Sequence, residues 1–201
     1  MYALVEDGSI SKLITNPKSM VIGDVRYPAK IFSVWSASEL NAIGIYEVVF
    51  DDSNKKDEQW YINTNQTFAF ADDTVTASYG SATPKAHADT LFTAQDEIDG
   101  KGTEGEVNAR GLKYNLIQKV KQQAAGLLQN TDWYITRKSD AGTEVPSSIT
   151  TYRASVRTKA DEMETAITNA SNTPALETLY TYTITDGVQS RPLGEFPTLE
   201  S

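Results

Sequence analysis

The side chains of this chain that could hold a metal ion are concentrated in one acidic segment. When Gly100 is aligned with the sixth residue of a calcium-binding loop, acidic residues fall at loop positions that supply oxygen ligands: Glu97 at three, Asp99 at five and Glu106 at twelve. Gln95, however, stands at position one. A solvated acidic linker before a helix explains the same residues, because carboxylates are favourable near a helix N-terminus. We favour the linker and expect no metal site.

The other candidate groups for catalysis lack the partners that catalysis requires. His87 is the one histidine of the chain, and no serine or cysteine motif lies near it. A catalytic base needs a proton donor and an orienting group. Adjacent carboxylates at 51–52 and 72–73 lie in expected turns between strands, whereas glycosidase carboxylates face each other across about 5 Å or more. We therefore expect a protein that is not an enzyme and holds no cofactor.

A separate group of aromatic and arginine residues has the composition of a protein-binding site. Asp132 and Trp133 are followed by Tyr152, Arg153 and Arg157 on a helical pattern. In a structural interpretation, Asp132 caps backbone amides of a turn, and Trp133 packs between two helices against Tyr152 or Arg153. In a functional interpretation, Trp133 and the three helical residues form a partner-binding patch, because Trp, Tyr and Arg dominate binding hot spots. We favour the structural interpretation, and both require these side chains to lie close together.

Two long amphipathic helices must position these residues. Apolar residues at helical spacing predict a helix over about 106–129 and a second over about 146–170. Joined by a connection over 131–145, the two helices should pack as an antiparallel hairpin or associate with copies of themselves. Thr173–Leu179 indicates a third, short helix. Two segments that flank Asp186-Gly187 suggest a terminal β-hairpin before a proline-rich tail.

The first half of the chain instead has the two-residue period of β-strands. Asp7-Gly8 between the apolar segments 2–5 and 10–14 is typical of a hairpin turn. Ser36 and Glu39 have the spacing of a capping box at the start of a short helix. A strand is expected over 45–50, and three further β segments, at 60–64, 67–70 and 75–79, predict an antiparallel meander.

These patterns predict an α+β protein. Glycine and acidic residues concentrate over 96–105, and the hydrophobic period changes beyond them. We expect a small antiparallel β-rich N-terminal domain over 1–95, a linker over 96–105, and a helical-hairpin assembly domain with a C-terminal tail over 106–201.

The composition narrows the classes of partner. The chain has 201 residues, no cysteine and a net charge of −9, so disulfides and thiolate sites are excluded, and a phosphate-seeking surface is disfavoured. No apolar run approaches the ~20 residues of a membrane span, and no signal peptide is evident. We expect no nucleic acid and no membrane partner. The low apolar content of 39% and the two amphipathic helices favour a homo-oligomer.

The helical half resembles the phage tail assembly chaperone module at the C-terminus of many tail-fibre assembly proteins. The residues that carry the resemblance are Leu127-Leu128, Thr131-Asp132-Trp133, Pro146, Tyr152-Arg153 and Arg157. The first half is similar in style to proteins of phage tail gene clusters, at Met1–Val5, Tyr27-Pro28, Trp35–Leu40 and Ile43–Tyr46. The chain departs from the usual pattern at Tyr134–Lys138 and in the tail from Pro174.

The resemblance implies a non-enzymatic phage tail or tail-fibre protein that acts by protein–protein interaction. It would be a virion structural adaptor or a tail assembly chaperone, with other tail or tail-fibre proteins as partners. Its location would be the virion tail, or the host cytoplasm during assembly. The alternative is a metal- or glycan-binding module. That module would hold calcium at the 96–106 acidic segment or glycans on four aromatic residues, Trp60, Tyr61, Phe68 and Phe70.

Overall fold

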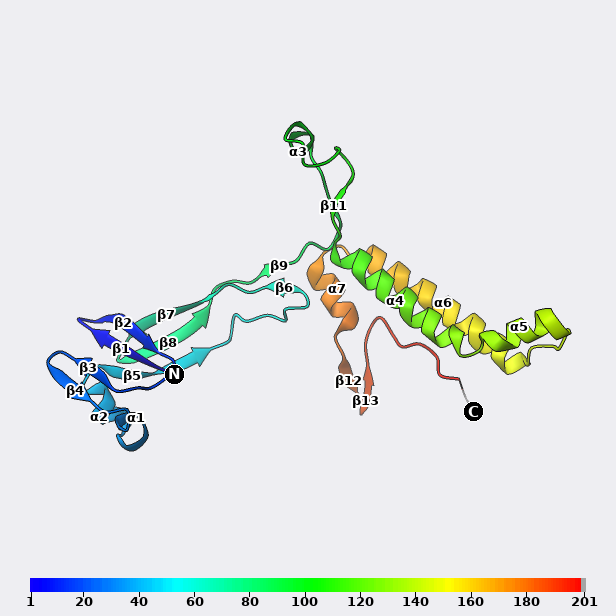
Figure 1. The fold of residues 1–201 in the computed structure, drawn as a ribbon. Coiled ribbons are helices and arrows are strands. Elements are labelled where there is room, and N and C mark those ends of the chain that lie inside the picture. The colour runs from blue at the N-terminus through cyan, green and yellow to red at the C-terminus, as the bar shows by residue number, and fades with distance from the viewer. Residues whose placement is uncertain (200–201) are drawn as a thin grey trace. The chain divides into compact units, whose positions relative to one another are not determined.

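The computed structural model describes residues 1–199 and has the predicted α+β fold (Figure 1). Its contacts divide the chain into two compact units, Met1–Thr83 and the residues from Pro84 onward. Each unit is built around its own apolar residues. No helix among residues 1–199 combines the length and the apolar character that crossing a membrane requires.

A five-stranded sheet forms the first unit, with strand order β2-β1-β5-β8-β7. The strands are β1 (Tyr2–Glu6), β2 (Ser9–Ile14), β5 (Ile45–Asp51), β7 (Gln66–Ala71) and β8 (Thr74–Tyr79). The predicted opening hairpin is confirmed, since β1 and β2 are antiparallel and Asp7 and Gly8 in their turn have φ of 50° and 73°. Such left-handed angles are what a two-residue hairpin turn needs.

The predicted antiparallel meander is confirmed for β7 and β8 and is wrong in two respects. Residues 60–64 do not join the sheet; they supply only the short strand β6 (Tyr61–Ile62) of a separate ladder with β9 (Thr83–Pro84). Within the sheet, β5 and β8 run parallel. The chain leaves β5, makes a long excursion and returns as β7. The tight β7–β8 turn then directs β8 alongside β5 in the same direction.

Apolar side chains cover both faces of this sheet. Alternate residues of the strands point to opposite faces, and one cluster contains Ala3, Val5, Val48, Val75 and Ala77. The other cluster includes residues of two short helices, α1 (Ile31–Val34) and α2 (Ala37–Asn41). The partly buried side chains that pack against it include residues of a small hairpin of β3 (Met20–Ile22) and β4 (Val25–Tyr27).

Residues close in sequence fix both the start of α2 and the turn that leads from α2 into β5. The predicted capping box is confirmed: the Ser36 hydroxyl accepts from the Glu39 amide, and the Glu39 carboxylate accepts from the Ser36 amide at 2.7 Å. Gly44 precedes β5 with φ of 80°, and its carbonyl accepts from the Val5 amide at 2.8 Å. A Cβ at Gly44 would lie 2.6 Å from the Val5 carbonyl oxygen, so a side chain is excluded there.

The second unit is organised around two long helices, α4 (Leu112–Gln129) and α6 (Ser147–Asn169). They run antiparallel, since Lys113 near the start of α4 donates to the carbonyl of Thr168 near the end of α6 at 2.8 Å. The buried apolar residues of both helices follow the two predicted stripes, so the predicted helical hairpin is confirmed. They are Leu116, Val120, Ala124, Ile149, Tyr152, Val156, Ala160, Met163 and Ile167.

Two shorter elements complete this unit near the C-terminus. The predicted third helix is α7 (Thr173–Tyr180). Asn172 caps its N-terminus, because the Asn172 side chain accepts a hydrogen bond from the Ala175 amide. The suggested terminal hairpin forms from β12 (Thr183–Thr185) and β13 (Val188–Ser190), with left-handed residues Asp186 and Gly187 between them.

Residues 90–109 form a projecting ribbon that we call the arm. Its strands are β10 (Thr90–Leu91) and β11 (Val107–Ala109), and α3 (Ala94–Ile98) lies between them (Figure 1). The helix predicted from residue 106 therefore begins only at Leu112, because residues 107–109 pair with β10. The expected linker 96–105 lies inside this unit, and its residues 96–98 form the last part of α3. A capping box of Thr93 and Asp96 begins that helix.

Candidate partner-binding site

Arg153 forms a buried contact node where α4 ends and α6 begins. Its side chain is 8% exposed. Its Nη1 atom lies 2.9 Å from the carbonyl oxygen of Leu128, 2.6 Å from Thr131 Oγ1 and 2.8 Å from Asp132 Oδ1. The hydroxyl of Thr131 also donates to the Leu128 carbonyl at 2.8 Å. The guanidinium thereby adds a charged donor to the Leu128 carbonyl, which also accepts from the Thr131 amide at 3.0 Å, and connects the end of α4 to α6.

A further helix, α5 (Asp132–Ala141), follows this node directly. The sequence predicts only a connection over 131–145, so this helix is a correction. Asp132 does not cap turn amides as predicted; it stands in the first turn of α5, and its carboxylate pairs with Arg153. The helix ends at Gly142, which has φ of 68°, the left-handed conformation that commonly ends helices.

The predicted group of four residues divides between an inner and an outer set. Tyr152 and Arg153 are buried in the helix pair, and Arg157 donates to the Arg153 carbonyl at a long 3.4 Å. Trp133 is 51% exposed. Its ring does not carry Arg153 as the predicted cation; Arg137 lies over it instead, 4.7 Å from the ring centre.

The outer set forms a surface on α5 that we call the α5 patch, made of Trp133, Tyr134 and Arg137. The two aromatic rings lie 3.8 Å apart, and the Arg137 guanidinium contacts both. No residue of α5 is buried. Within residues 1–199, the Nε atom of Arg137 is buried without a hydrogen-bond partner. This patch combines the three residue types that dominate protein-binding hot spots, Trp, Tyr and Arg.

Sequence reasoning missed Tyr134 and Arg137, although a signal for Arg137 was present. Trp133 and Arg137 are four residues apart, a spacing that brings side chains together on a helix. Gly142 gives the matching stop signal. These signals apply only if residues 132–141 are helical, and the polar composition of that stretch is more typical of a loop.

The acidic segment uses its carboxylates within the arm. Lys101 pairs with Asp96 at 3.3 Å and with Asp99 at 2.9 Å. The pKa of Asp96 is lowered, first by the Thr93 backbone amide that donates to it, and Glu97 accepts from the Glu104 amide at 2.9 Å. Among residues 1–199, no three acidic or histidine side chains gather as metal ligands would.

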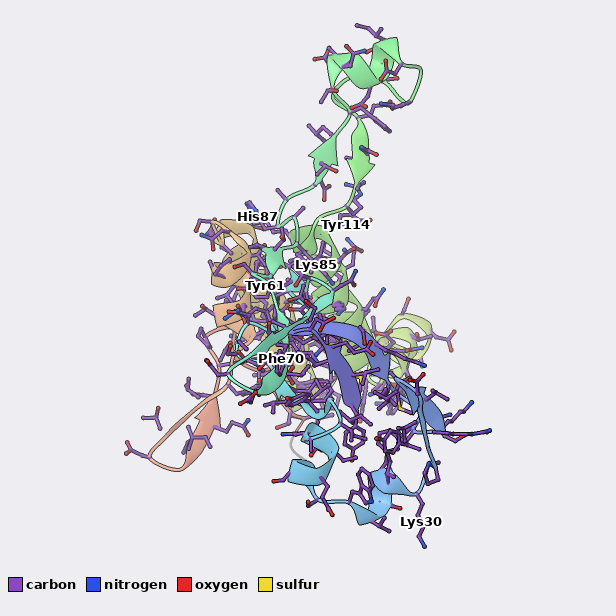
Figure 2. The ribbon with its side chains drawn as sticks, turned by 90° about the vertical axis from the view of Figure 1, so that its left-hand side faces the viewer. Lys30, Tyr61, Phe70, Lys85, His87 and Tyr114 are labelled. Carbon is purple, nitrogen blue, oxygen red and sulfur yellow. The ribbon has the colours of Figure 1, made fainter. Side chains whose placement is uncertain are left out.

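The other predicted candidates lie in structural surroundings. His87 stands at the base of the arm, where its carbonyl accepts from the Lys113 amide at 2.9 Å (Figure 2). Of the proposed glycan platform, Trp60 is buried, and Phe68 and Phe70 pack against the apolar core of the sheet. The ring of Phe70 also contacts Tyr46 at 4.8 Å. These three rings therefore do not form an exposed platform.

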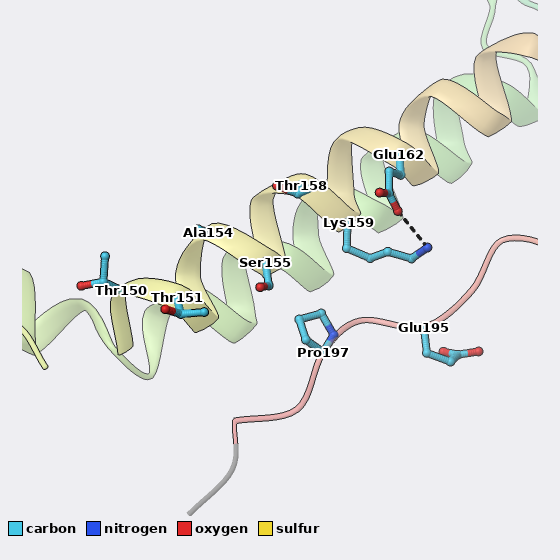
Figure 3. Close-up of a pocket in the computed structure, with 9 residues that line it drawn as sticks. All are labelled: Thr150, Thr151, Ala154, Ser155, Thr158, Lys159, Glu162, Glu195 and Pro197. Carbon is cyan, nitrogen blue, oxygen red and sulfur yellow. Dashed lines mark hydrogen bonds and ion pairs between the residues drawn. The ribbon is translucent and has the colours of Figure 1, made fainter. Parts of the chain in front are cut away.

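One groove lies along the outer side of α6, between that helix and the C-terminal tail (Figure 3). Its volume is about 610 Å³. Small uncharged residues line its helical side: Thr150, Thr151, Ala154, Ser155 and Thr158. Glu195 and Pro197 line the side of the tail, and Lys159 pairs with Glu162 at its edge at 3.2 Å.

Comparison of the chain with protein-family models, with curated proteins and with solved structures found no match. The resemblance to the tail assembly module therefore stays a prediction from the sequence residues that carry it.

Proposed function

We propose that this protein is a non-enzymatic phage tail or tail-fibre protein that acts by protein–protein interaction. It serves as a structural adaptor of the virion or as a chaperone of tail assembly. In this proposal the helical unit supplies the partner-binding surface, and the α5 patch is its centre. Other tail or tail-fibre proteins are its partners.

The arrangement of the residues that carry the resemblance supports this proposal. Leu128, Thr131, Asp132 and Arg153 meet in one hydrogen-bonded node. This node holds the end of α4 against α6 and fixes the first turn of α5, so that Trp133 is left exposed beside it. An exposed Trp on a fixed scaffold is costly to keep in water and valuable at a binding surface, because binding removes its apolar area from solvent.

Mass spectrometry of purified virions and of infected lysates tests the proposal and separates its two forms. A structural adaptor is present in purified particles together with tail proteins. A chaperone is absent from them but copurifies with a tail or tail-fibre protein from the lysate. If the protein is bound to no tail protein in either sample, the proposal is wrong.

A matched pair of variants tests the role of the α5 patch. The variant Trp133→Ser removes the exposed indole side chain of the patch and should lower recovery of the tail protein at least tenfold. This factor corresponds to about 1.4 kcal/mol, within the range of one hot-spot residue. Phe50→Ser removes an equally exposed side chain, 52% against 51% for Trp133, from strand β5 and should leave recovery unchanged.

A further inference from the structure

The arm exposes apolar side chains that its own unit does not cover. Ile98 at the end of α3 is 78% exposed, and Leu91 and Val107 on the two strands are also exposed. The strands have only two and three residues. A two-stranded ribbon of this size is marginally stable in water by itself. A covering surface would both shield Ile98 and order the ribbon.

The arm is also strongly acidic. Residues 90–109 contain five acidic residues and one lysine. Lys101 pairs with Asp96 and Asp99. Among residues 1–199, no basic side chain lies within ion-pair distance of Glu97, Glu104 or Glu106. The surface that covers Ile98 should therefore be apolar and carry a cation.

The α5 patch has this combination of properties. Trp133, which is 51% exposed, offers apolar area. The guanidinium of Arg137 is held over two rings, and no carboxylate among residues 1–199 lies within ion-pair distance of it. A cation that is already ordered by stacking loses little side-chain entropy when it binds an anion.

The arm and the α5 patch of one chain lie at opposite ends of α4. The arm ends just before Leu112, where the helix begins, and α5 starts after Gln129, where the helix ends (Figure 1). An 18-residue helix is about 27 Å long, and it separates the two surfaces. The two surfaces of one chain therefore do not meet, and an arm reaches an α5 patch only on a second copy of the chain.

We propose that the arm of one copy binds the α5 patch of another. Ile98 packs against Trp133, and Glu97 and Glu104 face Arg137. Because two different surfaces meet, the contact is head-to-tail, and each copy keeps one free arm and one free patch for further copies. The contact area is small, so we expect association at about 10–100 μM, in the weak class of interfaces. The inference rests on the proposed function only in taking the α5 patch as a binding surface.

Sedimentation analysis of three proteins at about 5–300 μM tests the contact. The wild type should show a weight-average mass that rises with concentration beyond that of a dimer. The arm variant Ile98→Asp and the patch variant Trp133→Asp should each remain monomeric. An equimolar mixture of the two variants should form a 1:1 heterodimer and stop there, because it contains one intact arm and one intact patch.

Two further variants control for nonspecific effects. Ile184→Asp changes an equally exposed isoleucine, 76% against 78% for Ile98, in the C-terminal hairpin and should associate like the wild type. Arg137→Glu should weaken association at least tenfold, and adding Glu97→Arg with Glu104→Arg to it should restore association. Each variant should fold, because all the changed side chains are at least partly exposed. Circular dichroism checks this.

The results that would overturn the contact are distinct from failure of the proposed function. A monomeric wild type over the whole range, association of Ile98→Asp, or no heterodimer in the mixture each excludes the arm–patch contact. Loss of association in Ile184→Asp would assign the interface to the C-terminal hairpin instead. If Ile98→Asp associates like the wild type while the Trp133 variant loses the tail protein, only the inference fails. If the wild type associates as expected but binds no tail protein, only the proposed function fails.

Discussion

At the scale of single residues, Arg153 is the side chain on which the helical junction depends most. Three oxygen atoms from two other segments lie within 2.9 Å of its Nη1 atom. One of them belongs to the buried Thr131, where water cannot replace the lost donor, and another is the Leu128 carbonyl, which keeps the amide and the hydroxyl of Thr131 as donors. The third oxygen belongs to Asp132, whose side chain is more than half exposed, so its ion pair with Arg153 contributes less to stability.

Replacing Arg153 with Met should lower the free energy of unfolding by about 2 kcal/mol, because the apolar stem is kept and the donors are lost. Chemical denaturation followed by circular dichroism measures this change. Arg157→Met is the matched control, since that side chain is exposed and makes only a long hydrogen bond; it should cost about 0.5 kcal/mol or less. Equal losses in the two variants would contradict the role given to Arg153.

At the scale of elements, two glycines in and before α4 should respond oppositely to alanine. Gly126 lies inside the helix with open space around it, so Gly126→Ala should stabilise the protein by about 0.5–1 kcal/mol through helix propensity. Gly111 caps the helix start, and a Cβ there would lie 2.3 Å from the Ala88 carbonyl carbon and oxygen. Gly111→Ala should therefore destabilise it by about 1–3 kcal/mol. Thermal melts of the two variants would refute this account if the shifts had the same sign.

The base of the arm should be sensitive to acid through Asp89. The pKa of its carboxyl is lowered, first by the Gly111 backbone amide and then by Arg110, which lie at 2.8 and 2.6 Å. A lowered pKa in the folded state means that the stabilisation is complete above the unfolded value, about 3.9, and is lost as pH falls through the folded value.

Hydrogen exchange should therefore show that protection of the Gly111 amide falls as the pH is lowered through this range. In Asp89→Asn the carboxylate is absent at every pH, so protection should be reduced at neutral pH and lose this acid-dependent step. An unchanged step in the variant would assign it to another group.

At the scale of the whole molecule, the two compact units should unfold separately. Each has its own buried apolar residues. Calorimetry should resolve two transitions. Gly44→Ala, which forces a Cβ against the Val5 carbonyl, should lower only the transition of the first unit, and Arg153→Met only that of the second. A single transition that both variants shift would show that the units unfold together.

The sequence by itself determined the features that depend on neighbours a few residues apart. Asp7-Gly8 predicted its hairpin because the turn angles are set by two residues. Ser36 and Glu39 predicted their capping box because its hydrogen bonds span three residues. The apolar stripe from Ile149 to Ile167 predicted the long helix α6 and its buried face, because periodicity reports burial directly.

Only the tertiary structure decided what depends on distant contacts. The parallel placement of β8 beside β5 follows from which strand fills the neighbouring position, and local propensity does not encode that choice. Arg153 is buried because acceptors 22 and 25 positions away converge on it, whereas Trp133, a residue type that is usually buried, stays exposed. Residue types alone placed Trp133 and Arg153 in one patch. The packing of α4 against α6 buries Arg153, whereas Trp133 lies on α5, none of whose residues is buried.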